Sequence, residues 1–509
     1  MRSSPFVLLA ALGLTSCTKD APPAPHAAVA VDADAGTPVT LTFFITGAEN
    51  GYLLPTAGEN VSHGGAAELL ARLTAEGHCA GPLSDAGQPS CADAGTVLLS
   101  TGDNANGAAI SSFFRGESAA EVMKQMGYAA SAFGNRELDW SRAQFLANSS
   151  RGGFPYLAAN LEAASDEARG LGLLPSRLIE RRGVKVGIIG LAARKATLTP
   201  MPGRMAGLSL ISEEAALARQ VPALRAAGAE VLVVVSDGCL DELTAALTAH
   251  PDWAVAFVAG RDCGAPWPQT VGATALVHPG RHFNAYSRVS LQVWPGRAPG
   301  QRVANVIVSP EVEVVGWPAA PSPDPQLGAL IAGWKTKLDA ALGETIGFTK
   351  SGLEQEEPLM AAWFTTALKE QFKTDAALLN RKGVRQALPP GPITQASIWD
   401  LAPFENEVLI VKLTGAQLKE ALANVEARAA GVREKGAAFV DGKGVPLADA
   451  KTYTVATTDY LYLGGDGFKL NEADRAPLPT QTSWQSALVD WTRARKSSQS
   501  KPLESLLKK

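Results

Sequence analysis

Short apolar segments alternate with helix-like segments from Val39 to about Trp317, and this alternation restricts the folds open to the chain. Runs such as TLTFFITG, TVLLSTGD and GVKVGIIGL have the length and composition of buried strands. Longer segments between them, such as GGAAELLARLTAEG and EEAALARQVPALRAAG, carry apolar residues at helical spacing. This order predicts an α/β domain with a buried sheet. Polar residues gather where the strands end, at the edge where open α/β sheets bind ligands.

A second α/β unit is expected to begin at about Thr345. The segment PAAPSPDPQ is a proline-rich break, and LGALIAGWKTKLDAALG follows it as a predicted helix that connects the two units. The tail after Arg493 is polar and is expected to be frayed. We therefore predict an N-terminal domain, a linker with its connecting helix, a C-terminal domain and a polar tail, at residues 39–317, 318–344, 345–495 and 496–509.

The charge of the chain argues against a nucleic-acid polymer as partner. Its 509 residues suffice for two or three domains. The 46 Lys and Arg residues and the 50 Asp and Glu residues give a formal net charge of only −4, whereas nucleic-acid-binding domains are typically basic.

The first residues predict export. Met1-Arg2 supplies a positive start, and the apolar run FVLLAALGLT that follows is too short to span a membrane. The sequence LTSC, which ends at Cys17, resembles the bacterial lipobox; cleavage would then remove residues 1–16 and leave Cys17 lipid-modified. The alternative is an ordinary secretory signal with an incidental cysteine. Residues 17–38 are rich in Ala, Pro and Asp and predict a tether.

This reading places the protein in the bacterial cell envelope, in the periplasm or at the outer membrane. No segment after the signal is long and apolar enough to be predicted as transmembrane. The lipid anchor is then the only expected contact with a membrane.

Several loop sequences, in order along the chain, resemble those of the 5′-nucleotidase family. The loops are GDN at 102–104, GN at 134–135, PF at 403–404 and GGDGF at 464–468. The resemblance covers about residues 40–495. It implies an α/β (α+β) fold with an N-terminal metallophosphatase-like αββα sandwich, a linking helix and a C-terminal 5′-nucleotidase-type α/β domain that recognises the substrate.

The family resemblance also implies two divalent metals, Zn or Mn, which clamp a phosphate and activate water. Of the seven ligands in the family pattern, only Asp103 and Asn135 remain. The expected catalytic histidine is Arg136, and other ligand positions hold Asp237 and Arg261. One carboxylate and one neutral amide cannot hold two dications, so we expect no metal cofactor and the loss of two-metal hydrolysis.

Two interpretations of Arg136, Asp237 and Arg261 follow. Arginine–aspartate pairs could fill the space that the metals left, since unpaired buried acids are costly. Alternatively, the arginines could bind a phosphate directly through forked hydrogen bonds. We favour the first interpretation, because arginines with acids nearby usually pair with them.

The C-terminal recognition residues of the family are largely present. By the resemblance, two residues contact the substrate, two rings stack a base and one carboxylate takes the ribose hydroxyls: Asn380 and Arg385, Phe404 and Tyr460, and Asp466. The alternative is that both rings are core aromatics and GGDGF is a tight turn. Arg381 and Lys382 replace two glycines and are expected to add positive charge, whereas Glu356 stands where animal members have a further arginine.

Four cysteines other than Cys17 remain, and an even number in an exported chain favours disulfides with three possible connectivities. Cys79 and Cys91 flank a loop rich in Gly, Pro and Ser. Cys239 and Cys263 each follow a strand that, by the resemblance, ends at the former metal site. We predict the pairs 79–91 and 239–263.

The sequence therefore favours a lipid-anchored protein that recognises a nucleotide or nucleoside. One alternative is an active phosphohydrolase with a rearranged or mononuclear metal site. Another is an envelope scaffold that retains only the fold.

Overall fold

A computed structural model describes residues 37–57, 62–91, 94–194, 204–295, 297–314, 322–436 and 438–507. Residues 36–509 form one compact unit. The predicted signal peptide, Cys17 and residues 18–36 of the predicted tether lie outside the described residues. No helix in the described ranges combines the length and the apolar composition needed to cross a bilayer.

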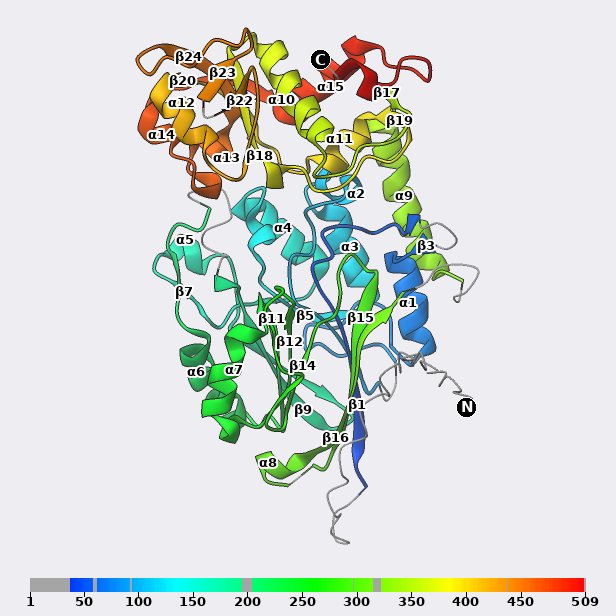
Figure 1. Cartoon of the computed structure of the whole chain (residues 1–509). Coiled ribbons are helices and arrows are strands. Elements are labelled where there is room, and N and C mark those ends of the chain that lie inside the picture. The colour runs from blue at the N-terminus through cyan, green and yellow to red at the C-terminus, as the bar shows by residue number, and fades with distance from the viewer. Residues whose placement is uncertain are drawn as a thin grey trace, which may run out of the picture. The chain divides into compact units, whose positions relative to one another are not determined.

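Two six-stranded sheets form the centre of the N-terminal part (Figure 1). The first has the order β16-β15-β1-β4-β5-β6, with bounds Val303–Glu313, Ala285–Val293, Val39–Thr46, Thr96–Ser100, Tyr128–Ala132 and Tyr156–Leu157. The second has the order β13-β14-β12-β11-β9-β8, with bounds Thr270–Val271, Thr274–Val277, Val255–Arg261, Val231–Cys239, Val184–Leu191 and Ser176–Arg181. Side chains from both sheets form one buried cluster, in which the Phe43 and Phe257 rings meet edge to face at 5.1 Å.

Helices cover the outer faces of both sheets, which completes the predicted αββα sandwich. The first sheet packs against α1 (Ala66–Ala75), α3 (Glu117–Met126) and α4 (Arg142–Gly152), whose apolar residues share a core with it. The second packs against α6 (Glu213–Ala226) and α7 (Asp241–Ala249). These helices form because their apolar residues recur on one face, as in the buried Leu69, Leu70 and Leu73 of α1.

The predicted connecting helix is α9 (Pro325–Leu342). Asp324 caps its first turn, since its carboxylate accepts a hydrogen bond from the Leu327 backbone N–H at 2.8 Å. Pro325 occupies the first helical position, where its missing N–H costs no hydrogen bond. The indole of Trp334 donates to Glu121 of α3 at 2.9 Å, so α9 is fixed to the N-terminal part.

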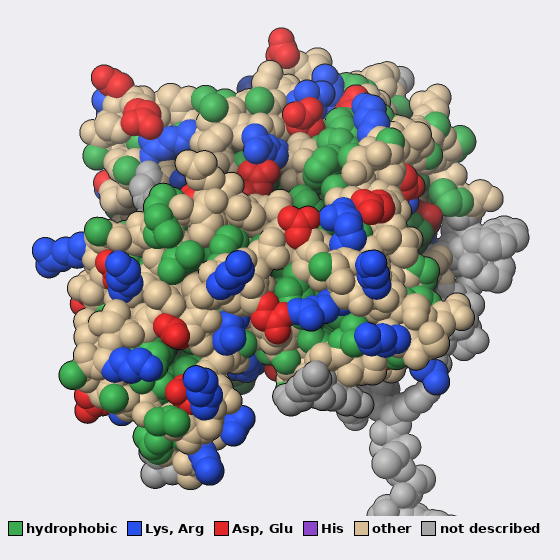
Figure 2. Space-filling model, turned by 90° about the horizontal axis from the view of Figure 1, so that it is seen from above, with side chains coloured by type: hydrophobic (Ala, Val, Ile, Leu, Met, Phe, Trp, Pro, Cys, Tyr) green, Lys and Arg blue, Asp and Glu red, His purple; other side chains and the backbone are tan. Residues whose placement is uncertain are grey.

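A five-stranded sheet organises the C-terminal part. Its order is β21-β18-β24-β20-β25, with bounds Ala427–Ala430, Ala376–Asn380, Thr452–Thr458, Glu407–Thr414 and Leu478–Ser483. Helices α10 (Pro358–Phe372) and α15 (Trp484–Arg495) share one core with it, and α12 (Gly415–Leu422) shares a second. On the face shown in Figure 2, acidic and basic side chains are interspersed and leave no broad region of a single charge.

The C-terminal tail is ordered, contrary to the expected fraying. It forms α16 (Leu503–Leu507), in which Leu503 is fully buried. The Glu504 carboxylate accepts hydrogen bonds from the backbone N–H groups of Lys350 and Ser351 and from the Thr349 hydroxyl. One buried leucine and one carboxylate bound to several donors are enough to hold a segment that is otherwise polar.

Candidate functional site

The residues that align with the metal loops of the family pattern meet at the carboxyl ends of four strands. Asp103 follows β4, and Asn135 begins the 3-10 helix η1 (Asn135–Leu138) after β5. Asp237 lies near the end of β11, and Arg261 is the last residue of β12. Strands β4 and β5 are parallel, so their carboxyl ends lie at one edge of the first sheet, and the same holds for β11 and β12 in the second sheet. The contact between Arg261 and Asp103 joins the two edges. These are the edges at which the sequence predicts the site.

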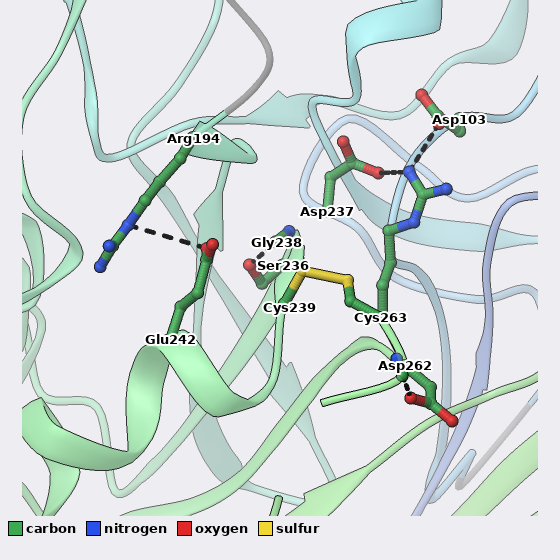
Figure 3. The surroundings of a disulfide bond; sticks show 11 residues. Asp103, Arg194, Ser236, Asp237, Gly238, Cys239, Glu242, Asp262 and Cys263 are labelled. Carbon is green, nitrogen blue, oxygen red and sulfur yellow. Dashed lines mark hydrogen bonds and ion pairs between the residues drawn. A yellow bond between two sulfur atoms is a disulfide. The ribbon is translucent and has the colours of Figure 1, made fainter. Parts of the chain in front are cut away.

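One guanidinium joins the two aspartates. Nη1 of Arg261 donates to Oδ2 of Asp103 at 2.8 Å and to Oδ1 of Asp237 at 3.0 Å. Both aspartates are buried, and Figure 3 shows them with these contacts drawn as dashed lines. Asp103, with Asp237, raises the pKa of Arg261 above its already high usual range, so this residue is a permanent cation. Arg261 thus forms the pairs that the first interpretation predicts.

A disulfide closes the same two strands just beyond this ion pair. Cys239 and Cys263 are bonded with their Cα atoms 5.6 Å apart, and Cys239 lies opposite Arg261 in the strand register (Figure 3). The bond therefore fixes the strand end that carries Arg261 beside the one that carries Asp237. Cys79 and Cys91 are bonded as well, so both predicted disulfides are confirmed.

Arg136 behaves differently from Arg261. Its backbone N–H donates to Oδ1 of Asp103 at 3.0 Å, which anchors η1 to the β4 loop. Its guanidinium lies near two other residues. It makes a long 3.4 Å contact with Asp139 and lies 4.8 Å from the centre of the Phe404 ring. The residue in place of the family histidine therefore faces the C-terminal part.

The sequence predicts no role for two acids beside Arg136, the buried Glu137 and the largely buried Asp139. Glu137 accepts from the Asn104 backbone at 3.0 Å, and Asp139 accepts from Asn106 at 2.6 Å. Burial and the charge of Asp103 raise the pKa of Glu137 well above its usual range, and burial raises that of Asp139. The segment FGNRELDW contains both acids, but nothing in its pattern says that they are buried.

The loop that follows β1 contains another acid that sequence reasoning did not identify. Glu49 is fully buried, and its carboxylate accepts a hydrogen bond from the Phe283 backbone N–H. Burial raises the pKa of Glu49 to about 8. The group is therefore mainly protonated at neutral pH, which lowers the cost of burying it.

The donor set does not fit a two-metal centre. Among the described residues, no group of three or more His, Cys, Asp or Glu side chains is placed to hold a metal ion. The oxygens of Asp103 and Asp237 that face each other are bound by Arg261. A cation there would have to displace a guanidinium that is already paired with both acids.

The residues predicted to recognise the substrate in the C-terminal part form two groups. In the first, Asn380 donates to Oδ2 of Asp466 at 2.7 Å, and the Tyr460 hydroxyl donates to Oδ1 of Asp466 at 3.3 Å. Asp466 has a left-handed backbone (φ 50°), and its carbonyl accepts from Asn424, a residue that sequence reasoning did not select. Each carboxylate oxygen retains a second lone pair, so ribose hydroxyls can still donate to it.

Phe404 and Arg385 form the second group. The Phe404 carbonyl accepts hydrogen bonds from the side chains of Trp484 and Gln485, both at 2.6 Å, which fixes the loop. The Arg385 guanidinium lies 4.9 Å from the centre of the Phe404 ring. Burial and the charge of Arg136 lower the pKa of Arg385 to about 10. At least one face of the ring is thus covered by a guanidinium, which the base-stacking prediction did not anticipate.

The added positive charge of the 381–382 loop is neutralised locally. Arg381 pairs with Glu356 at 2.9 Å and with Glu426 at 3.4 Å, and Lys382 pairs with Glu426 at 3.0 Å. The expectation that both residues supply free positive charge is therefore corrected. The acid at position 356 and the cation at 381 occur together because each balances the other.

A cavity of about 570 Å³ lies beside α9 and is separate from both groups. Tyr52, Ile110, Gln386 and Asp400 are among its lining residues, and no predicted site residue lines it. Asp400 accepts from the Ala109 backbone N–H at 2.6 Å, which joins the N-terminal and C-terminal parts. The cavity borders this contact.

A family model described as "5′-nucleotidase, C-terminal domain" matches residues 336–472. Protein UshA from Yersinia enterocolitica is 22% identical over 464 residues, which cover 79% of this chain and 83% of UshA. Endonuclease YhcR from Bacillus subtilis is 22% identical over 354 residues, which cover 64% of this chain but only 28% of YhcR. The cell wall protein Lmo0130 from Listeria monocytogenes is 20% identical over 438 residues, which cover 71% of this chain and 55% of Lmo0130.

Solved structures share the fold. The 5′-nucleotidase precursor from Thermus thermophilus has a TM-score of 0.71 and 20% identity, with 91% of this chain and 97% of that chain covered. A putative 5′-nucleotidase from Staphylococcus aureus has a TM-score of 0.66 and 16% identity, with 89% and 96% covered. The predicted resemblance to the 5′-nucleotidase family and the predicted fold class are confirmed.

Proposed function

We propose that this chain, which has the fold of 5′-nucleotidases and carries their C-terminal domain, binds a nucleotide or nucleoside and does not hydrolyse it by a two-metal mechanism. The observation that carries the proposal is the guanidinium of Arg261 between Asp103 and Asp237. A metal pair and this guanidinium compete for the same carboxylate oxygens. Displacing a paired arginine from two buried acids is costly, so the ion pair excludes the metals.

The recognition half of the site supports the binding role. Asn380, Tyr460 and Asp466 are joined by hydrogen bonds in the C-terminal part, and none of these bonds needs a metal. The Tyr460 ring lies close to Gly465 and packs against a buried core cluster, but the residue is only partly buried, so part of its surface is exposed. A base stacked on such a ring gains roughly 1–3 kcal/mol in other base-binding proteins.

We propose that the protein is localised in the bacterial cell envelope and is anchored there by a lipid on Cys17. The support is the sequence of residues 1–17, together with two disulfides, which persist in oxidising compartments. Cys17→Ser is expected to move the protein from the membrane fraction to the soluble exported fraction. A Cys17→Ser protein that stayed with the membranes would contradict the anchor.

The central experiment combines three measurements on purified protein. Calorimetry with adenosine and adenosine monophosphate in EDTA should detect binding. Metal analysis should find less than one Zn or Mn per chain, and neither metal should stimulate phosphate release. Robust metal-dependent release that Asp103→Ala abolishes would instead establish the alternative, a hydrolase with a rearranged or mononuclear site. No binding by well-folded protein, with or without Zn, would favour the envelope scaffold.

A further inference from the structure

We propose that Arg136 and Arg385 together form a metal-independent site for a phosphate group, with one arginine from each part of the chain. The inference rests on the proposed nucleotide-binding function and assigns the phosphate of the ligand to these two side chains. It also gives a role to Arg136, the residue that stands where the family has its catalytic histidine.

The geometry brings the two guanidiniums to one ring. The Cζ atoms of Arg136 and Arg385 lie 4.8 Å and 4.9 Å from the centre of the Phe404 ring. Arg136 belongs to η1 in the N-terminal part, whereas Arg385 follows the 381–383 turn in the C-terminal part. A group that binds both arginines is therefore held by both parts of the chain at once.

These two arginines have unused donors, unlike the other basic residues at the site. Arg261 is bound to two aspartates, and Arg381 and Lys382 are bound to glutamates. No hydrogen bond or ion pair joins the Arg385 guanidinium to any described residue, and its Nε is buried without a partner. Within the described part of the chain, the Arg136 guanidinium has a single ion pair, the 3.4 Å contact with Asp139.

An anion would remove an electrostatic conflict between the two cations. Besides burial, the charge of Arg136 lowers the pKa of Arg385, so the charge of Arg136 disfavours the charged form of Arg385. The Phe404 ring compensates them only partly, because a cation–π contact is weaker than a charge-assisted pair. A phosphate offers several oxygens to two planar forks, which is the geometry that arginine binds best.

Binding of a phosphate to the two arginines would also expose a face of the Phe404 ring. A base can stack on the covered face of Phe404 only when a guanidinium leaves it. A phosphate that draws the arginines off the ring makes this face available. A phosphorylated ligand should then bind more tightly than the bare nucleoside, and it should do so without metal.

The test is calorimetry in EDTA with adenosine, adenosine monophosphate and inorganic phosphate. The wild-type protein should prefer the monophosphate to adenosine. In Arg136→Gln and Arg385→Gln, the ratio of the affinity for the monophosphate to the affinity for adenosine should fall by about tenfold to a hundredfold, the usual effect of losing a charged hydrogen bond. Arg136→Lys keeps the charge but loses the planar fork. Its affinity for the monophosphate should lie between that of the wild type and that of Arg136→Gln.

Arg169→Gln is a matched control, since Arg169 is an exposed arginine paired with Asp166. It should bind like the wild type. Thermal melting of every variant shows whether the fold is kept. Inorganic phosphate should compete with the monophosphate in the wild type but only weakly in Arg136→Gln.

Equal affinities for adenosine and its monophosphate in the wild type would overturn this inference and leave the proposed nucleoside-binding function intact. An unchanged preference for the monophosphate in a folded Arg136→Gln protein would also overturn it. Absence of binding by all three compounds would reject the proposed function itself, so the two failures are distinct.

Discussion

Asn380 and Asp466 are joined by a 2.7 Å hydrogen bond, which links the end of β18 to the GGDGF loop. The carboxylate is thereby oriented before any ligand arrives, and the Tyr460 hydroxyl holds its other oxygen. Two loops far apart in the sequence meet here, as the family resemblance implies for the ribose contact. The arrangement gives a direct test of the recognition half of the site.

Asp466→Ala should weaken nucleoside binding by about tenfold or more, because a carboxylate that accepts hydroxyl hydrogen bonds is lost. Glu420→Ala is a suitable control, since Glu420 is an exposed acid of α12. Calorimetry with adenosine measures both variants. Equal binding by wild type and Asp466→Ala would show that Asp466 has only a structural role in its turn.

Arg261→Ala should destabilise the protein by about 2 kcal/mol. Removing one partner of a buried ion pair typically costs about 3–5 kcal/mol, and the partial exposure of Arg261 reduces this value. The variant leaves Asp103 and Asp237 buried without their cation. Burial raises the pKa of Asp237 well above its usual range, so the loss of stability should grow as pH rises and Asp237 ionises. Urea unfolding at pH 5 and pH 8 measures the effect. Arg194→Ala, which removes a more exposed arginine, should cost less than about 1 kcal/mol.

Glu49 should make stability depend on pH. Its pKa is raised from 4.5 to about 8, so between these values the folded state binds more protons than the unfolded state. Stability conferred by the protonated group is complete below pH 4.5 and is lost as pH rises toward 8, with a slope of at most about 1.4 kcal/mol per pH unit. Glu49→Gln should remove this slope and be relatively most stabilising at pH 8. Parallel pH profiles of the two proteins would contradict the assignment.

Loss of the Cys239–Cys263 disulfide should affect both stability and the ion pair. The bond closes a 24-residue separation, and a loop of that size contributes about 3 kcal/mol through the unfolded chain. The double variant Cys239→Ser/Cys263→Ser should lose about this amount in urea unfolding. Cys79→Ser/Cys91→Ser is the matched control, because it removes the other disulfide away from the site. Combining each pair with Arg261→Ala should reveal coupling only for Cys239–Cys263.

Much of the fold was predictable from local patterns. Buried strands such as β9 and β11 are short apolar runs, and α9 begins at a proline after an aspartate, so periodicity and capping rules locate them. The Cys79–Cys91 pair was predictable because both cysteines flank one short loop. The Cys239–Cys263 pair was predictable because the family resemblance brings the ends of their strands together. The order of the tail was missed because it depends on Leu503 and Glu504 finding partners in a distant strand and turn.

The site was predicted only in part, since its contacts join residues that are far apart in the sequence. Arg136 and Arg261 both stand at positions where the family pattern has a histidine. Only the Arg261 guanidinium pairs with Asp103 and Asp237, whereas that of Arg136 lies near the Phe404 ring. The neutralisation of Arg381 and Lys382 by Glu426 depends on the neighbouring strand β21. Burial of Glu137 likewise depends on the packing of three loops, which no local pattern encodes.

The ion pair of Arg261 has a consequence for the conditions under which the protein stays folded. A phosphatase held by bound zinc loosens when chelators or competing organisms deplete that metal, because binding energy is then withdrawn from its native state. Here a tethered guanidinium and a covalent bond hold the strand ends together. Neither can diffuse away. We therefore expect the folded population to be the same in zinc-starved and zinc-replete surroundings.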